Sequence, residues 1–358
     1  MIKLVEGLPR PADLDEVELA DRALLHGYIS DVIRYEGDEG ALLTGALRGL
    51  AHHQRLDLHG GATRIGWVVA HLADGEIADR VISSIDETVL RALDDWHGPY
   101  DLIGGLVGFG VYALERHEHD HTLANRVIHL LEESARARGD GVGWFTGPEL
   151  LPEHQRELAP SGYWNLGVAH GIPGVIALLA QYVRAGVEVD RAQPLLERAV
   201  AYLVGAVPKG GYPRWHTDDG PTEPPVGLAW CYGDLGISIA LLAAARACER
   251  ADWNELAMLL IRACAALAPP RSGGIEVGLC HGSAGIAHLF HRCFLATGDP
   301  ASGTASRHWL AATIATLSQT SLPNSTLLTG ATGVALVLHS FISDLTPDWD
   351  RLLLADPL

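Results

Sequence analysis

One short signature recurs six times along this 358-residue chain and limits the folds that the chain can adopt. The signature is one or two apolar residues, often a polar residue, then Gly-x-x-Gly, then an apolar helical run. Its first glycine falls at residues 61, 105, 171, 233, 282 and 330, so the repeat is about 45 to 65 residues long. In the first copy, Arg64 takes the place of the second glycine. Each period has room for two helices and their loops.

Apolar residues recur at intervals of three and four, and alternation with period two is nearly absent, so we expect an almost wholly α-helical protein. The runs that follow the glycines, such as VIALLAQYV and ISIALLAAA, are apolar on most sides and should be buried. The intervening runs, such as residues 77–93 and 122–133, have one apolar stripe and should form an outer layer.

Six buried helices inside six amphipathic helices predict a closed α/α toroid. An open solenoid of helix pairs is the alternative, which six repeats would also support. We expect a single domain over residues 1–358, with an N-terminal helical segment over residues 1–50 and repeats from about residue 55 to 343.

Polar side chains concentrate just before three consecutive glycine turns, at His170, at Cys231-Tyr232 and at Cys280-His281. In a closed ring these turns lie at one end and converge on one cavity. Two thiolates and an imidazole are typical zinc ligands, and three protein ligands with one open position are typical of catalytic zinc. We therefore predict that Cys231, Cys280 and His281 bind Zn²⁺. The alternatives are two unrelated buried cysteines with a capping histidine, or a closed four-ligand site, for which His170 is the only candidate.

His170 precedes the glycine of the third repeat, and Asp101 approaches the same cavity from the second repeat. A carboxylate that holds an imidazole in one tautomer and raises its basicity forms a general acid or base. The alternative is that Asp101 caps a helix and His170 is an ordinary core histidine, and spacing leaves both open. Tyr232 either orients groups in the pocket or packs against them.

Composition argues against several other functions. The formal net charge of −18 disfavours a nucleic-acid partner. No apolar run has membrane-spanning or signal-peptide character, so we expect a cytoplasmic protein without membrane insertion. Five cysteines argue against a disulfide framework. Cys248, Cys264 and Cys293 lie in Ala/Leu-rich helical runs and should be ordinary core residues. The histidine-rich run over residues 116–121 should be a solvated loop.

Four segments, taken in order, resemble the signature motifs of the LanC-type lanthionine cyclases. They are Tyr100-Asp101-Leu102-Ile103, the run NLGVAHGIPG from Asn165, Trp230-Cys231-Tyr232-Gly233 and Cys280-His281-Gly282. The resemblance extends from about residue 55 to 343. It implies an α/α toroid, Zn²⁺ held by Cys231, Cys280 and His281, His170 and Asp101 as an acid/base pair, and Tyr232 as a pocket tyrosine.

The resemblance also implies an activity. A lanthipeptide cyclase adds a cysteine thiolate of a dehydrated precursor peptide to a dehydroalanine or dehydrobutyrine of the same peptide, which forms a (methyl)lanthionine thioether ring. The zinc ion would lower the pKa of the substrate thiol, and His170, oriented by Asp101, would protonate the enolate. A dehydratase is a further candidate partner.

The chain departs from the family pattern at Gly227, four residues before the first predicted zinc cysteine, where the family often has an arginine. Arg214 is the candidate replacement, in a Pro- and Gly-rich loop over residues 211–225 that we expect to overhang the cavity. We also expect little room for the small β domain inserted in some members.

Two other functions are consistent with parts of the pattern. One is a non-catalytic LanC-like zinc protein that binds a thiol such as glutathione, or a partner protein. The other is a toroidal glycoside hydrolase, which would need paired carboxylates near the inner turns and would leave the cysteines unexplained.

Overall fold

A computed structural model describes residues 1–33, 38–50, 54–116, 121–205, 211–221, 227–267, 276–319, 322 and 324–357. The chain divides into two compact units. Unit 1 consists of residues 1–87 and 265–350, and unit 2 of residues 88–264 and 351–358.

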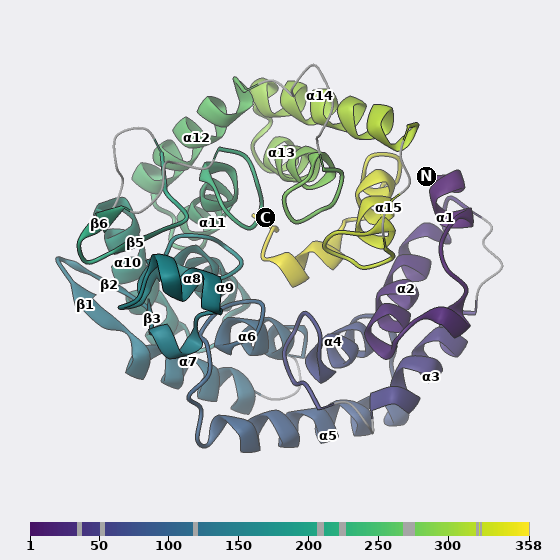
Figure 1. The fold of residues 1–358 in the computed structure, drawn as a ribbon, viewed down its shortest axis with the longest axis horizontal. Helices are drawn as coiled ribbons and strands as arrows, with labels where there is room; N and C mark the ends of the chain where they lie inside the picture. Colours follow the sequence, from purple (N-terminus) through teal and green to yellow (C-terminus); the bar gives the residue numbers. More distant parts are fainter. Residues whose placement is uncertain are drawn as a thin grey trace. The chain divides into compact units, whose positions relative to one another are not determined.

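Most described residues of unit 1 are helical (Figure 1). Its elements are α1 (Ile2–Glu6), η1 (Pro11–Asp13), α2 (Glu16–Ile29), α3 (Glu39–Leu50), α4 (Ala62–Leu72), α13 (Ser283–Thr297), α14 (Pro300–Leu317) and α15 (Ala331–Ser340). The helix α5 (Glu76–Leu93) and the 3₁₀ helix η3 (Asp348–Leu353) continue from unit 1 into unit 2, and the last residue of α12 (Ala251–Ala265) belongs to unit 1.

Unit 2 combines helices with short strands. Its helices are α6 (Leu106–Glu115), α7 (Thr122–Ser134), η2 (Pro148–Leu150), α8 (Glu153–Leu158), α9 (Ile172–Ala185), α10 (Val189–Gly205), α11 (Asp234–Ala247) and α12 (Ala251–Ala265). Its strands are β1 (Arg136–Arg138), β2 (Gly141–Gly143), β3 (Phe145–Thr146), β4 (Tyr163–Asn165), β5 (Trp215–Thr217) and β6 (Gly220–Pro221).

Buried and amphipathic helices alternate along the chain, as the periodicity predicts. Every residue of α9 from Ile172 to Tyr182 is buried, and the same holds for α11 from Leu235 to Ala245. By contrast, α7 buries one stripe at intervals of one, three and four: Leu123, Ala124, Val127, Ile128 and Leu131. The helix after each glycine turn is thus the core member of its pair.

In unit 1 the N-terminal segment is part of the core. Helix α2 packs against α3, α4 and α15, while α13 packs against α14 and α15 (Figure 1). A capping box starts α2, because the Asp15 carboxylate accepts from the Glu18 amide and the Glu18 carboxylate accepts from the Asp15 amide. Residues before the first repeat therefore contribute a helix that contacts both the first and the sixth buried helices.

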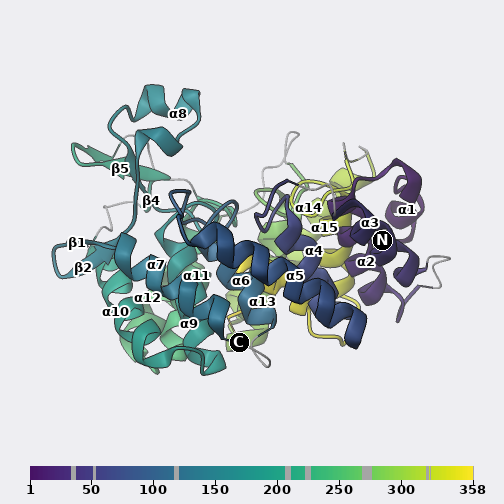
Figure 2. The ribbon, with the colours of Figure 1, turned by 90° about the horizontal axis from the view of Figure 1, so that it is seen from below.

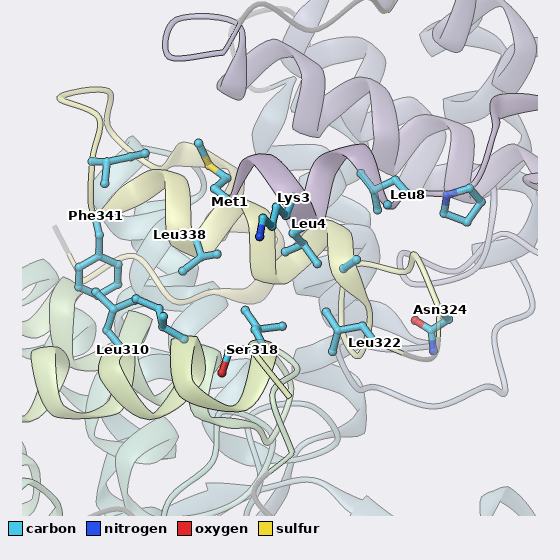
Figure 3. Close-up of a pocket in the computed structure, with 16 residues that line it drawn as sticks. Met1, Lys3, Leu4, Leu8, Leu310, Ser318, Leu322, Asn324, Leu338 and Phe341 are labelled. Atoms are coloured by element: carbon cyan, nitrogen blue, oxygen red, sulfur yellow. The ribbon is translucent and has the colours of Figure 1, made fainter. Parts of the chain in front are cut away.

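An apolar groove of about 610 Å³ lies between α1, α14 and α15 (Figure 3). Leu4, Leu310, Leu338 and Phe341 are among its lining side chains. No cysteine, histidine or carboxylate is found among the described residues that line it. The groove therefore does not have the composition of the predicted metal site.

Unit 2 contains a small antiparallel sheet with the strand order β3-β4-β5-β6, beside a separate β1-β2 hairpin. Figure 2 shows that α8 and β5 project away from the other helices of this unit. Leu151, Ala159, Tyr163 and Trp215 form its small core, where the Tyr163 and Trp215 rings stack with centroids 5.3 Å apart.

The expectation of little room for an inserted β domain was therefore wrong. Strands of two or three residues are too short to show period-two alternation. Part of the expected loop over residues 211–225 forms β5 and β6, and residues 222–225 lie outside the described residues.

None of the described helices is long and apolar enough to cross a membrane. The five cysteines, all of them described residues, carry thiols rather than disulfide bonds. Cys264 and Cys293 are buried as predicted, whereas Cys248 is only half-buried at the end of α11. Of the histidine-rich run, residues 117–120 lie outside the described residues.

Candidate functional site

The six glycines that open the repeats are the N-cap residues of α4, α6, α9, α11, α13 and α15. At the third residue after the N-cap glycine, the helix backbone lies close to the backbone of the turn that precedes the helix. A Cβ atom on Gly285 would lie 1.8 Å from the carbonyl oxygen of Leu279, and one on Gly333 would lie equally close to the Leu327 oxygen. In the repeats that carry this second glycine, only glycine permits so close an approach to the residues just before the N-cap, whereas the first repeat has Arg64 there.

Backbone hydrogen bonds join neighbouring turns within each unit. In unit 2, the Leu102 amide donates to the Ala169 carbonyl (3.2 Å), and the Ala169 amide donates to the Cys231 carbonyl (3.4 Å). In unit 1, the Cys280 amide and the amide before it both donate to the Leu328 carbonyl, at 2.8 and 2.9 Å. Each acceptor lies two residues before an N-cap glycine, so the bonds hold this position in register from turn to turn.

Asp101 and His170 form a hydrogen-bonded pair in unit 2. His170 Nδ1 lies 2.6 Å from Asp101 Oδ2, and the second carboxylate oxygen accepts from the Gly104 amide at 2.8 Å. Asp101 thus caps its turn and also holds the imidazole, which are the two roles that spacing left open. Because an ionised carboxylate only accepts, the ring proton sits on Nδ1 and Nε2 is the nitrogen left for proton transfer.

Tyr232 is placed beside this pair. Its ring centroid lies 6.3 Å from that of His170, and its hydroxyl accepts from Asn165 Nδ2 at 3.1 Å. Burial raises the pKa of the Tyr232 hydroxyl, which therefore keeps its proton at neutral pH. The structure brings Asp101, His170 and Tyr232 together within one unit.

Asn165 is a site residue that the sequence analysis did not single out. Its side chain is fully buried, and its Oδ1 accepts from the Gly167 amide at 2.9 Å while its Nδ2 reaches Tyr232. The available signal was an Asn-x-Gly turn ahead of the third repeat, because asparagine side chains commonly bind backbone amides two residues on.

The turn before α11 carries Cys231. Its side chain is half-buried, and the N-cap Gly233 that follows has φ = 117°, a conformation that favours glycine. The Cys231 carbonyl is engaged by the third-repeat turn, as described above, so the residue sits on a restrained backbone. Cys231 thus offers a thiol from the same end of unit 2 as His170.

The turn before α13 carries Cys280 and His281 in unit 1. The Cys280 thiol is half-buried, and the His281 side chain is 45% exposed. His281 Nε2 lies 2.5 Å from the carboxylate of Glu276, which leaves Nδ1 as the ring nitrogen available to a metal ion. A carboxylate on the second nitrogen is the usual partner of a metal-binding histidine. Glu276 was missed because one acidic residue before a turn is not a distinctive pattern.

The family arginine has no side-chain equivalent at its usual position, since Gly227 is an exposed glycine. Arg214 directly precedes β5; its carbonyl accepts from the Leu166 amide at 2.9 Å, and its side chain is exposed. Its backbone is thus anchored beside the third-repeat turn. A catalytic role for Arg214 stays a prediction.

Comparison with known proteins gives concordant matches. The family model of lanthionine synthetase C-like proteins matches residues 22–354. The nisin biosynthesis protein NisC of Lactococcus lactis subsp. lactis is 23% identical over 257 residues, which are 65% of this chain. The chain spans about 60% of that relative's length.

Among solved structures, one called nisin cyclase matches with a TM-score of 0.80 at 19% identity, over 96% of this chain and 93% of that one. At this identity the similarity concerns the fold, which is an α/α toroid. The predicted fold class is therefore confirmed, and the open solenoid is excluded.

Proposed function

The chain belongs to the lanthionine synthetase C-like protein family, and from this premise we propose that it is a zinc-dependent lanthipeptide cyclase. Its substrate is a dehydrated peptide in which a cysteine thiol adds to a dehydroalanine or dehydrobutyrine. One observation carries the proposal: Cys231 and Cys280 occupy the same position in their turns, two residues before an N-cap glycine, and His281 follows the second cysteine.

The donor chemistry of these three residues fits zinc. Cys231, Cys280 and His281 offer two sulfur donors and one imidazole, which are typical zinc ligands. Zinc held by these residues would lower the pKa of a substrate thiol, so that a thiolate would be present at neutral pH. The partial exposure of all three side chains is consistent with a site that a peptide can reach.

Other residues of the site deliver the proton that the α-carbon of the substrate takes up. Addition of the thiolate sulfur to the β-carbon forms the C–S bond and moves the electron pair of the double bond toward the carbonyl, which gives an enolate. His170 is the group that protonates the α-carbon from Nε2, because Asp101 occupies Nδ1 and stabilises the imidazolium form. The His170 side chain is 41% exposed, so the ring recovers its proton from solvent.

Tyr232 orients this proton donor. Its protonated hydroxyl is held by Asn165, and its ring packs beside the imidazole. The Tyr232 ring therefore limits the orientations that the His170 imidazole can take. We assign Tyr232 to the catalytic group for this reason.

A non-catalytic thiol-binding protein is the second candidate, and one observation favours it. Gly227 supplies no cationic side chain for the developing enolate, whereas a protein that only binds a thiol would not need one. Both candidates predict zinc; they differ in whether a thioether forms.

Two measurements test the proposal. Metal analysis of the purified protein should give about one zinc per chain, which Cys280→Ala should lose and Cys264→Ala, a buried cysteine of α12, should keep. Zinc retained in Cys280→Ala would overturn the ligand assignment.

The second measurement uses a model peptide with one cysteine and one dehydroalanine, followed by alkylation of free thiols and mass spectrometry. Loss of the free thiol without a mass change, at a rate above that of the peptide alone, supports a cyclase. Unchanged thiols with several such peptides, in protein that holds zinc, would favour the thiol-binding function.

A further inference from the structure

The first repeat differs from the other five at Arg64, which replaces the second glycine and is almost completely buried (1% exposed). Its Nη2 lies 2.8 Å from Nδ1 of His59, in the turn before α4. Its Nε lies 3.7 Å from Oδ1 of Asp21, a buried carboxylate on α2. One guanidinium thus links a repeat turn to the N-terminal helix.

The second oxygen of Asp21 accepts from the backbone amide of Leu327 at 3.3 Å. Leu327 lies three residues before the N-cap glycine of the sixth repeat. The amides at this position in the second and fifth repeats, Leu102 and Leu279, donate to a carbonyl of a neighbouring turn. In the sixth repeat the Asp21 carboxylate takes the place of that carbonyl.

Asp21 and Arg64 therefore join the sixth and first turns through side chains. His59, the residue that Arg64 contacts, lies two residues before its N-cap glycine, which is the position of the carbonyl acceptors in the other turns. A glycine at position 64 could not make this connection. The departure from the repeat pattern and the extra N-terminal helix have one structural explanation.

The connection continues to the predicted metal ligands. Leu328, which follows the amide held by Asp21, is the residue whose carbonyl accepts from the Cys280 amide at 2.8 Å. The fifth and sixth turns are also in close contact, since a Cβ atom on Gly278 would lie 3.0 Å from the Thr329 Cα atom. A shift of residues 327–329 would therefore move the turn that carries Cys280 and His281.

We propose that Asp21 and Arg64 are positioning residues that hold the Cys280-His281 turn in the geometry needed to bind the metal ion. The metal role of this turn rests on the proposed function. The positioning itself does not, because it depends only on contacts within unit 1. The N-terminal helix α2 is then a support of the metal centre as well as part of the core.

Asp21 and Arg64 are oppositely charged groups that are both buried. Burial raises the pKa of Asp21, and the positive charge of Arg64 acts in the opposite direction. Removing Arg64 would leave a buried carboxylate without its cation, which commonly destabilises a whole domain. Asp21→Asn is the better probe, because it keeps the shape and an oxygen acceptor while removing the charge.

The first test is amide hydrogen exchange of Leu279 and Cys280 in the full-length protein, both metal-free and loaded with zinc. Asp21→Asn should speed their exchange about tenfold or more in the metal-free protein. The matched control is Asp31→Asn. Asp31 binds His339 and Ser343 at the other end of the contact between α2 and α15, so its loss should leave the Cys280 turn unchanged.

The second test is metal affinity, by competition with a chromophoric chelator, together with the absorption spectrum of the Co²⁺-substituted protein. Asp21→Asn should weaken zinc binding about tenfold and alter the cobalt bands, as expected when a support of a ligand is lost. Arg64→Lys, which keeps a cation, should have a smaller effect than Arg64→Met. Asp31→Asn should leave affinity and spectrum unchanged.

Unchanged exchange and affinity in a folded Asp21→Asn protein would overturn the proposal, even if its melting temperature fell. If that variant does not fold, Ser325→Ala removes the 2.7 Å hydrogen bond by which Glu18 of α2 holds the same segment. It should accelerate exchange at Leu279 and Cys280 to a smaller degree, and no acceleration would also refute the proposal. A wild-type protein without zinc affinity would defeat the proposed function but not the exchange result.

Discussion

Replacing Asp101 by asparagine removes the negative charge beside His170 with little change in size. The asparagine oxygen can still accept from the Gly104 amide, so the turn before α6 should persist. The amide nitrogen, however, would face His170 Nδ1 and donate to it. The imidazole would then carry its proton on Nε2 in the neutral form, without a carboxylate to stabilise the imidazolium that protonates the substrate.

The structure sets the size of the effect. A hydrogen bond to a charged group contributes about 1.5–3 kcal/mol, and about 1.4 kcal/mol corresponds to a factor of ten. The Nδ1–Oδ2 distance of 2.6 Å is typical of a strong charged pair, but His170 is 41% exposed, so water screens the interaction. We therefore expect the rate of thioether formation to fall about 10- to 30-fold.

The assay is single-turnover cyclisation of a dehydrated model peptide, with quenching by a thiol-alkylating reagent. The control is Asp252→Asn, which should react at the wild-type rate. Asp252 is an exposed residue of α12 that pairs with Arg250. Zinc content and melting temperature of Asp101→Asn should match the wild type. A rate within twofold of the wild type at equal zinc content would refute the role of Asp101.

Three further predictions concern other parts of the chain. Glu276→Gln should weaken zinc binding about tenfold, measured by chelator competition, because the amide supports His281 less well than the carboxylate; unchanged affinity would exclude this support. Gly285→Ala should lower the unfolding free energy, measured in urea melts, by about 2 kcal/mol or more. The control is Gly205→Ala, whose added Cβ atom would have no neighbour within 4 Å and should change the unfolding free energy by less than about 0.5 kcal/mol. Equal effects would contradict the close-approach explanation. Burial lowers the pKa of His291 to about 4 from its ordinary value near 6.5. Between these pH values the imidazole binds a proton in the unfolded state but not in the folded state, so the unfolding free energy should fall as pH falls. His291→Gln should flatten this pH dependence, and an unaltered slope would argue against the role of His291.

Local sequence determined most of the fold. The buried and half-buried helices follow from apolar periodicity over 10 to 18 neighbouring residues, which is information that a short window contains. The N-cap glycines follow from the repeat itself. The residues that lead into the second and third glycine turns also pointed to Asp101 and His170, whose side chains lie 2.6 Å apart in the structure. The zinc ligand set, the single-domain organisation, the dehydratase partner and the cytoplasmic location stay predictions.

The inserted sheet could not be predicted because its strands are too short for a pattern and are joined across the chain. The Trp164–His216 pairing of β4 and β5, for example, links residues far apart in sequence. Glu276 and Asn165 were missed for a related reason. A single polar residue has many possible partners, and only the folded backbone selects one.

The repeat glycines, which define this chain, show where the two kinds of information separate. The sequence alone established that five repeats carry a second glycine and that the first carries Arg64. Only the tertiary structure decided that Arg64 points to Asp21, and that Asp21 holds Leu327 from 306 residues away. Hydrophobic periodicity acts between neighbours and is visible in any short segment. A buried charge is stabilised by the partner that folding brings to it, and that partner leaves no trace in the local sequence.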